Sequence, residues 1–492
     1  MKLGALASRA GMALPDSSDA QVTGFAIDHR KVAPGTVFGA FVGTQVNGES
    51  FIPAAVAAGA VAVVARSEAP VAGAVHIAAA EPRRAFAQLA AGFFSPVPAT
   101  IVAVTGTNGK TSCVELTRQL WRMLGERAAS IGTLGVTNAD ESISTGLTTP
   151  DIVTFLANMS GLAREGVTHV AYEASSHGLS QYRNEGLNVM AGGFTNLSRD
   201  HLDYHADMDD YFAAKMRLFD EVVDPAGTVV VWADDDWADK VAEHVRQRGL
   251  RLLSVGEKAD RTNDNTQGSS IRLLARSPSQ LGQTLEVEHG GQAYVIKLPL
   301  IGAYQAANAL LSAGLAIATG SDPARVFDAL SRLQPVRGRL ERAAISRAGT
   351  PIYVDYAHTP DALEAAMAAL RPHCAGRLIV VFGAGGDRDQ GKRPEMGRVV
   401  AAQADLGLVT DDNPRSEGPA AIRTAILAGG QGALRDGGER RASIAAAIAE
   451  AGPQDIVLIA GKGHEQGQII GAGEAMRVLP FDDVTVAREC AA

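Results

Sequence analysis

The chain has 492 residues, and at roughly 150 residues per domain this length predicts about three domains. Hydrophobic residues make up 46% and charged residues 20%, a globular balance that excludes collagen-like, coiled-coil and low-complexity classes. The 45 Lys and Arg residues against 54 Asp and Glu give a net charge of −9, so no broad basic surface exists and we expect no nucleic-acid partner.

The cysteine content and the apolar segments favour a cytoplasmic protein. Cys113, Cys374 and Cys490 are too few and too scattered for a disulfide framework or a cysteine zinc site. Residues 1–15 lack the long apolar run of a signal peptide. The most apolar stretch, residues 54–65, is too short to span a bilayer, so we expect no membrane partner. We also expect a monomer.

The fold class is predicted to be α/β with three domains. The sequence Ser95-Pro96-Val97-Pro98 cannot continue a helix, which places a first boundary near residue 97. A strand at 101–104, a glycine turn and a helix with Leu116, Leu120 and Leu124 on one stripe then open a parallel sheet. Strands at 169–172 and 228–232 extend this sheet.

The second boundary is predicted near residue 335. The polar stretch 258–270 is interpreted as an exposed loop within the middle domain, and helices are expected at 305–318 and 322–332. Beyond them, buried parallel strands that end in polar loops are predicted at 351–356, 378–382, 406–410 and 456–460. The predicted domains are therefore 1–97, 98–335 and 336–492, with ligands at the carboxyl ends of the strands.

A phosphate loop is predicted between the strand at 101–104 and the helix after it. In Gly106-Thr107-Asn108-Gly109-Lys110-Thr111, backbone amides and the helix N-terminus can cradle phosphate. Lys110 can neutralise the phosphate and Thr111 can hold magnesium. Only two residues separate Gly106 from Gly109-Lys110, so the loop is not a standard Walker A sequence.

Residues 105–111 (TGTNGKT), following an apolar strand, resemble the Mur ligase and folylpolyglutamate synthase superfamily. Five further motifs extend the resemblance to the Mur ligases over nearly the whole chain: residues 173–179 (EASSHGL), 196–203 (NLSRDHLD), 355–360 (DYAHTP), 412–415 (DNPR) and 461–465 (GKGHE). The resemblance implies an N-terminal α/β uridine-binding domain, a central P-loop-type ATPase domain with a mostly parallel sheet, and a C-terminal Rossmann-like domain.

The resemblance also implies an ATP-dependent amide ligase of peptidoglycan precursor synthesis. Its substrates would be ATP, UDP-N-acetylmuramoyl-L-alanyl-D-glutamate and meso-diaminopimelate, with an acyl-phosphate intermediate and Mg²⁺ as cofactor. One alternative is a folylpolyglutamate synthase, which joins glutamate to a folate but does not account for the DNPR and GKGHE loops together. The other is a non-catalytic, nucleotide-dependent binding module, which could have lost Lys110, Glu173, His201, Lys215 and Asp355.

Magnesium lets γ-phosphate and a carboxylate approach, and Thr111 and Glu173 offer the hard oxygen ligands it prefers. The resemblance adds His201 and Lys215 as metal ligands. It assigns catalytic roles to Lys110, Glu173, His201, Lys215, Asp355 and His358. It assigns ATP binding to Gly106, Thr107, Asn108, Gly109, Lys110, Thr111, Ser112, Asn308 and Arg339.

Lys215 lies in residues 211–219, an amphipathic helical segment on which a lysine normally faces water. The resemblance instead implies that carbon dioxide carbamylates this lysine to N6-carboxylysine, an acidic group that can bind a second magnesium ion. This chemistry requires burial that lowers the lysine pKa enough to expose a neutral amine.

Residues 382–388 (FGAGGDR) partly match a dinucleotide fingerprint, but Arg388 occupies the third glycine position. The resemblance instead assigns diaminopimelate binding to Arg388, Asp412, Asn413, Pro414, Arg415, Gly461 and Glu465. An arginine fork holds a carboxylate in two hydrogen bonds. Arg415 therefore favours meso-diaminopimelate over lysine, which lacks the second carboxylate. The rival interpretation is a turn with a solvated arginine.

For the nucleotide-sugar peptide, the resemblance assigns Ile27, His29, Thr44, Gln45, Val46, Thr148, Thr149, Ser175, Gln181 and Arg183. The chain departs from the usual family residues at His29, Leu147, Trp232 and Gln305. These departures concern individual contacts rather than the reaction.

Overall fold

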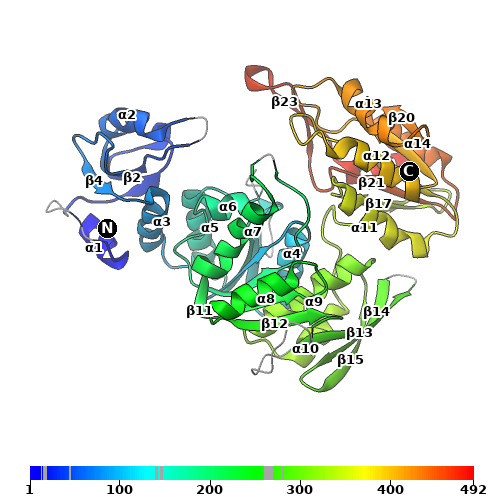
Figure 1. Cartoon of the computed structure of the whole chain (residues 1–492), viewed down its shortest axis with the longest axis horizontal. Coiled ribbons are helices and arrows are strands. Elements are labelled where there is room, and N and C mark those ends of the chain that lie inside the picture. Colours follow the sequence, from blue (N-terminus) through cyan, green and yellow to red (C-terminus); the bar gives the residue numbers. More distant parts are fainter. Residues whose placement is uncertain are drawn as a thin grey trace.

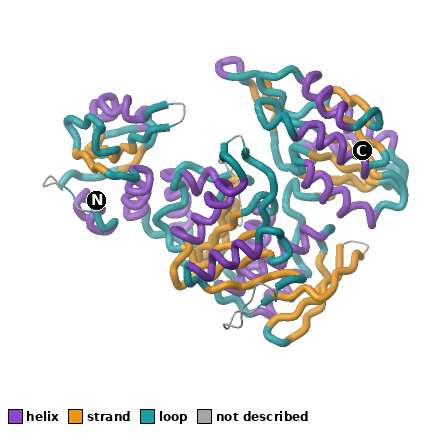
Figure 2. Tube along the Cα trace, viewed as in Figure 1, coloured by secondary structure: helices purple, strands orange, loops and turns teal. Residues whose placement is uncertain are grey.

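The computed structural model describes residues 1–12, 14, 19–43, 46–138, 142–143, 148–202, 204–259, 270–279 and 282–492. Within them, three sheets flanked by helices follow one another along the chain (Figures 1 and 2). The predicted three-domain α/β class is confirmed. Among the described helices, none is long and apolar enough to cross a membrane.

The N-terminal sheet has four parallel strands in sequence order, and three helices accompany it. The strands are β1 (Gly24–Ala26), β2 (Thr36–Gly39), β3 (Ala60–Ala65) and β4 (Val75–Ala78), and the helices are α1 (Leu3–Arg9), α2 (Ile52–Ala57) and α3 (Pro82–Phe93). One continuous apolar cluster contains Phe86 of α3 and Phe155 of the central domain, so α3 joins the first two lobes.

The central sheet contains eleven strands among the described residues, in the order β15-β14-β13-β12-β11-β10-β5-β9-β6-β7-β8. They are β5 (Thr100–Thr105), β6 (Ala128–Gly132), β7 (Gly135–Thr137), β8 (Ser142–Ile143), β9 (His169–Glu173), β10 (Val189–Phe194), β11 (Val223–Trp232), β12 (Arg251–Gly256), β13 (Ile271–Ser279), β14 (Gly282–His289) and β15 (Gln292–Leu298). Pairing is parallel from β13 to β6 and antiparallel at both edges.

The inner strands confirm the mostly parallel sheet, whereas the antiparallel edges were not predicted. The helices of this lobe are α4 (Lys110–Met123), α5 (Ile152–Arg164), α6 (Ser176–Ser180), α7 (Met208–Arg217), α8 (Ala238–Gln247), α9 (Ala303–Ala318) and α10 (Pro323–Leu330). Leu116 and Leu120 of α4 are fully buried, as the helical stripe predicted. Of the polar stretch predicted as an exposed loop, residues 260–269 lie outside the described residues.

The C-terminal sheet has the order β16-β17-β21-β18-β19-β20. Its strands are β16 (Glu341–Ile345), β17 (Pro351–Asp355), β18 (Leu378–Phe382), β19 (Leu406–Thr410), β20 (Leu434–Gly438) and β21 (Ile456–Ala460), and its helices are α11 (Pro360–Leu370), α12 (Lys392–Gln403), α13 (Pro419–Gly429), α14 (Arg440–Glu450) and α15 (Asp483–Ala491). Three predicted strands coincide with β18, β19 and β21, whose residues are all buried.

One expectation about this sheet was wrong. We expected the strand at 351–356 to be its first, but β16 precedes β17 and pairs with it antiparallel. A hairpin, β22 (Gly467–Ile470) and β23 (Arg477–Pro480), extends from the same lobe near the loop after β19 (Figure 1).

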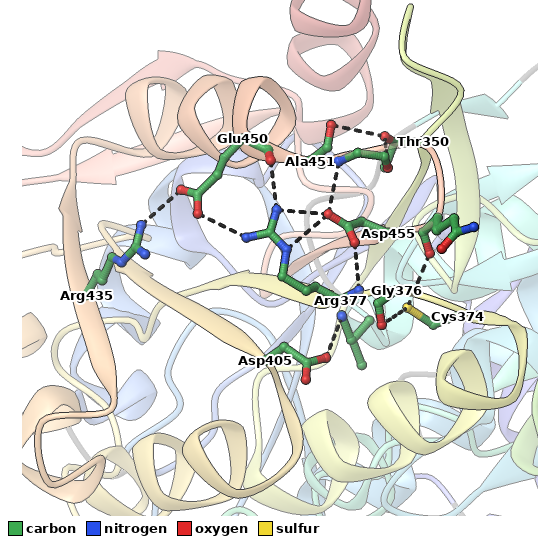
Figure 3. Close-up of polar contacts among 12 residues, drawn as sticks. Thr350, Cys374, Gly376, Arg377, Asp405, Arg435, Glu450, Ala451 and Asp455 are labelled. Atoms are coloured by element: carbon green, nitrogen blue, oxygen red, sulfur yellow. Dashed lines mark hydrogen bonds and ion pairs between the residues drawn. The ribbon is translucent and has the colours of Figure 1, made fainter.

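The amino ends of β18 and β21 are joined by an ion-pair network (Figure 3). Arg377 donates from Nη2 to Asp455 Oδ2 at 2.9 Å and from its backbone N to Asp455 Oδ1 at 2.6 Å. It also donates to Glu450 Oε1 at 3.2 Å, and Arg435 donates to the other oxygen of Glu450 at 2.9 Å. The network therefore lies at the opposite end of the strands from the polar loops described below.

Candidate active site

The phosphate loop between β5 and α4 has a shape that requires two glycines. Gly106 (φ 144°) and Gly109 (φ 86°) both adopt backbone conformations that L side chains rarely adopt. A Cβ at Gly106 would lie 1.8 Å from Thr195 Oγ1, and one at Gly109 would lie 2.4 Å from Asn308 Oδ1. The loop is braced from β10, because Thr195 donates to Asn108 O at 2.6 Å and Asn196 Oδ1 accepts from Asn108 N at 2.8 Å.

Two lysines, the half-buried Lys110 and the buried Lys215, meet on this loop. Lys110 Nζ donates to Gly106 O at 2.9 Å and to Thr107 O at 2.7 Å, while Lys215 Nζ donates to Gly106 O at 2.7 Å. Lys215 is 1% exposed and lies over the Tyr211 ring, with Nζ 4.2 Å from the ring centroid. Burial, and then the charge of Lys110, hold the pKa of Lys215 well below its ordinary value. The expectation that a lysine on an amphipathic helix faces water is therefore wrong for Lys215.

Glu173, the last residue of β9, is 2% exposed and faces the turn after β6. Its Oε1 accepts from Thr133 N at 2.7 Å, and its Oε2 lies 3.1 Å from Thr133 Oγ1. Thr133 Oγ1 also lies 3.2 Å from Thr148 Oγ1, and Thr149 donates to the Glu173 carbonyl at 3.0 Å. The carboxylate is thus fixed in place next to the predicted peptide-binding threonines.

Five of the predicted sugar-peptide residues gather in the central lobe: Thr148, Thr149, Ser175, Gln181 and Arg183. Thr149 Oγ1 lies 3.0 Å from Ser175 Oγ, and Arg183 donates to Thr149 O at 2.9 Å and to Gln181 Oε1 at 2.7 Å. In the N-terminal lobe, His29 stacks on Phe51 with ring centroids 4.3 Å apart, and Ile27 and Val46 are exposed. Thr44, Gln45 and Leu147 lie outside the described residues.

His201 adopts a left-handed conformation (φ 55°) in the loop after β10. Its Nε2 lies 3.5 Å from Asp200 Oδ2, and its ring is 6.1 Å from that of Tyr211. Tyr211 Oη lies 3.3 Å from Thr107 Oγ1 of the phosphate loop. The structure thus brings His201 to the Tyr211 and Lys215 side of the phosphate loop.

The loop after β17 joins the C-terminal lobe to the phosphate loop. Asp355 accepts from Leu340 N at 2.6 Å and Ala357 N at 2.8 Å, and burial raises its pKa to about 6. His358 Nδ1 lies 2.8 Å from Tyr356 O. Arg339 stacks on Tyr356 and donates to Thr111 Oγ1 at 3.0 Å, so a predicted ATP-binding residue of the last domain contacts one of the central domain.

The loops after β19 and β21 form a second polar cluster. Asn413 donates to Glu465 Oε2 at 2.8 Å, and its Oδ1 accepts from Lys462 Nζ at 2.8 Å and from Ile469 N of the hairpin at 2.9 Å. Arg415 (φ 51°) donates to Gly386 O at 2.8 Å. Pro414 and Gly461 are buried in these loops, whereas Arg388 is exposed in the loop after β18.

Two charged residues of this cluster were not assigned from the sequence. Lys462 is fully buried and belongs to the GKGHE motif, so the sequence could have suggested it as a partner of Asn413 and Glu465. Arg440 is also fully buried, and no motif marks it. Arg440 is the first residue of a helix whose sequence carries no functional motif, so only the fold reveals its position.

Magnesium fits the donors at the phosphate loop. Among the described residues, no group of three or more His, Cys, Asp or Glu side chains could hold a metal ion. Thr111, in the first turn of α4 after β5, and Glu173, at the carboxyl end of the neighbouring strand β9, are buried oxygen donors. Such a sparse donor set suits Mg²⁺, which takes one or two carboxylates and completes its shell with phosphate and water oxygens.

Comparison with known proteins finds matches along nearly the whole chain. Three family models match: "Mur ligase family, catalytic domain" at residues 21–94, "Mur ligase middle domain" at 104–316 and "Mur ligase, glutamate ligase domain" at 338–463. The UDP-N-acetylmuramoyl-L-alanyl-D-glutamate–2,6-diaminopimelate ligase of Zymomonas mobilis is 59% identical and the alignment covers 99% of this chain and 98% of the relative. The protein of the same name from Bradyrhizobium diazoefficiens is 52% identical, over 98% of this chain and 97% of the relative.

Solved structures agree with these matches. A structure of a UDP-N-acetylmuramoyl-L-alanyl-D-glutamate–2,6-diaminopimelate ligase superposes with a TM-score of 0.71 at 31% identity, covering 100% of this chain and 98% of the other. Mycobacterium tuberculosis folylpolyglutamate synthase with ADP gives 0.61 at 20% identity over 77% of this chain and 91% of the other, a likeness of fold alone. This chain belongs to the Mur ligase family.

Proposed function

We propose that the chain is an ATP-dependent ligase that adds meso-diaminopimelate to UDP-N-acetylmuramoyl-L-alanyl-D-glutamate in peptidoglycan precursor synthesis. One observation carries this proposal: the DNPR and GKGHE loops form one polar cluster, and their lobe contacts the phosphate loop through Arg339 and Thr111. Two relatives that are 59% and 52% identical over nearly the whole chain bear the corresponding name.

The phosphate loop would hold ATP. Backbone amides at the start of α4 would face the phosphates, and the residues in contact with them would be Gly106, Thr107, Asn108, Gly109, Thr111 and Ser112. Lys110 would exchange its carbonyl partners Gly106 and Thr107 for phosphate oxygens. Asn308, Arg339, Asp355 and His358 would contact the nucleotide from the two facing lobes.

Thr111, Glu173, His201 and carbamylated Lys215 would hold magnesium. When bound, magnesium neutralises phosphate charge so that a carboxylate can approach the γ-phosphate. In this chain Thr133 donates to Glu173 from its backbone N–H and its hydroxyl, which fixes the orientation of the carboxylate.

The chemistry proceeds in two transfers. A carboxylate oxygen of the UDP-linked dipeptide attacks the γ-phosphorus, forming the acyl phosphate while the bond to ADP breaks. The amine of diaminopimelate then attacks the acyl carbon, a C–N bond forms, the C–O bond to phosphate breaks, and the amine loses its proton. Arg183, Thr148, Thr149, Ser175 and Gln181 would hold the dipeptide next to Glu173, which supplies the proximity that both transfers need.

We further propose that Lys215 is carbamylated. A neutral amine can attack carbon dioxide, forming the N–C bond and releasing a proton, and burial of Lys215 favours the neutral amine. Native mass spectrometry with and without bicarbonate tests this, with Lys215→Arg as the matched control. The expected result is an added mass of one carbon dioxide in the wild type alone. A wild-type mass that is the same with and without bicarbonate would contradict the modification.

The amino-acid end would be recognised by Arg388, Asp412, Asn413, Pro414, Arg415, Gly461 and Glu465. Arg415 would bind the distal carboxylate, and Asp412 and Glu465 would face the ammonium at the same end. The UDP end would lie at Ile27, His29, Thr44, Gln45 and Val46. We propose that residues 1–97 bind the UDP sugar, residues 98–335 bind ATP and residues 336–492 bind the amino acid. We also propose that the protein is a cytoplasmic monomer.

Release of phosphate from ATP tests the reaction. We expect release only when UDP-N-acetylmuramoyl-L-alanyl-D-glutamate and meso-diaminopimelate are both present with Mg²⁺, together with a product of tripeptide mass. Release with a folate and glutamate would instead support a folylpolyglutamate synthase. Absence of release with either pair would support a non-catalytic binding module.

A further inference from the structure

A buried ion pair lies directly behind the loop after β19. Arg440, the first residue of α14, and Asp483, the first residue of α15, are both fully buried. Arg440 donates from Nε and Nη2 to the two oxygens of Asp483 at 2.8 and 2.7 Å, and from Nη2 to Ala460 O at 3.0 Å. Two hydrogen bonds to one carboxylate and a third to a strand end fix the guanidinium plane.

The remaining side of this guanidinium faces the amino-acid loops. Arg440 Nη1 lies 3.7 Å from Asp412 Oδ2, and in the described part of the chain this buried nitrogen has no hydrogen-bond partner. Gly461 makes room here, because a Cβ at that position would lie 2.9 Å from Asp412 Oδ2 and 3.8 Å from Arg440 Nη1. Arg440 therefore acts on Asp412 through charge without occupying its oxygen in a hydrogen bond.

Apart from Arg415, whose charge would pair with the substrate carboxylate, the cluster carries an excess of negative charge. Arg440 and Lys462 supply two cations, while Asp412, Glu465 and Asp483 supply three carboxylates. The pKa of Asp412 lies below its ordinary value: burial opposes ionisation, but the charges of Lys462 and Arg440, together with the Asn413 backbone N–H and His358, outweigh it. The single unbalanced negative charge fits one ammonium group, because a buried charge is stable only when it is paired.

We propose that Arg440, held by Asp483, is a positioning residue that presents Asp412 to the non-reacting ammonium of the amino-acid substrate. The proposal rests on the proposed function. Arg415 lies two residues beyond Asn413 and would bind the carboxylate at the same end of the substrate, so this end is recognised as a zwitterion. The Arg440–Asp483 pair then contributes to the choice of a substrate with two amino groups over one with a single amino group.

A substrate pair separates this role from a general structural one. meso-Diaminopimelate and L-2-aminopimelate share the carbon chain, both carboxylates and the reacting amine, but the second lacks the distal ammonium. For the wild type we expect kcat/KM at least about tenfold higher with diaminopimelate, since charged hydrogen bonds contribute about 10- to 100-fold. Arg440→Gln should raise the KM for diaminopimelate about tenfold, leave the KM for ATP unchanged and remove most of the preference. Arg440→Lys should restore part of it.

Removing one partner of a buried ion pair can prevent folding, so the double variant Arg440→Gln/Asp483→Asn is measured as well. The control is Arg377→Gln/Asp455→Asn, a more exposed Arg–Asp pair at the far end of the same sheet (Figure 3), which should keep the preference. Equal losses with both substrates in the Arg440 variants would overturn the proposal, and so would a wild type without preference. A wild type that makes no product with either substrate would refute the proposed function instead.

Discussion

Replacing Gly106 by alanine tests whether the shape of the phosphate loop, rather than its charge, supports turnover. The new Cβ would lie 1.8 Å from Thr195 Oγ1 and about 3.0 Å from the backbone of Asn196. Thr195 is buried and its hydroxyl donates to Asn108 O at 2.6 Å, so its rotation would break a hydrogen bond that braces the loop. The loop itself must therefore move away from β10.

The distance sets the size of the effect. Real Cβ contacts are not closer than 3.0 Å, so a displacement of about 1.2 Å is required. A misplacement of about 1 Å at reacting groups costs on the order of 100-fold in rate. We expect kcat to fall about 100-fold, with weaker nucleotide binding, while the protein remains folded.

Gly125→Ala is the control, because Gly125 also has a positive φ (101°) but nothing lies within 4 Å of its added Cβ. It should lose about 1–2 kcal/mol of stability from backbone strain and keep its turnover. Phosphate release, nucleotide titration and thermal unfolding of both variants give the comparison. A Gly106→Ala enzyme with wild-type kcat would refute the argument from loop shape.

Three further predictions concern individual side chains. Arg415→Ala should raise the KM for diaminopimelate about 10- to 100-fold and leave that for ATP unchanged in steady-state assays, and equal effects on both would count against its role. Glu173→Gln keeps an acceptor for Thr133 N but loses the charge, so kcat should fall about 100-fold with a higher Mg²⁺ requirement, and an unchanged Mg²⁺ titration would exclude Glu173 as a ligand. Burial, and then the charges of Arg339 and Arg337, lower the pKa of His464 from 6.5 to about 3. The folded state therefore resists protonation, and stability present above pH 6.5 is lost as pH falls toward 3. His464→Gln should reduce the loss between pH 7 and 4.5 by about 3 kcal/mol in urea unfolding, and parallel curves for the two proteins would contradict this.

The sequence predicted several of the strands that are buried on both faces, although it missed others such as β6. Continuous apolar runs such as 378–382 have no other stable environment than the middle of a parallel sheet, and β18 has these bounds. β16 was missed because its five residues are mostly polar or exposed at the sheet edge, which gives neither an apolar run nor clear alternation. β15 was missed for a similar reason, since four of its seven residues are exposed.

Site residues were predictable where a motif names them and not where burial decides their chemistry. The pattern around Lys215 is that of a solvated helical lysine, and only the packing of α7 against the phosphate loop buries its ammonium. Arg440 has no local signal, because its partners Asp483 and Asp412 are distant in sequence. The assigned roles of the motif residues themselves stay predictions until the variants are measured.

The close contact of Gly338 with the loop after β21 has a consequence for building chimeric enzymes. A Cβ at Gly338 would lie 2.3 Å from His464 N, while the adjacent Arg339 reaches Thr111. A graft that exchanges the last lobe at Gln334-Pro335 would carry a foreign version of this short segment onto a host phosphate loop. Hybrids joined after β16 retain the host residues 336–345. They should accept a donor lobe only when the donor loop after β21 leaves room for the host Gly338.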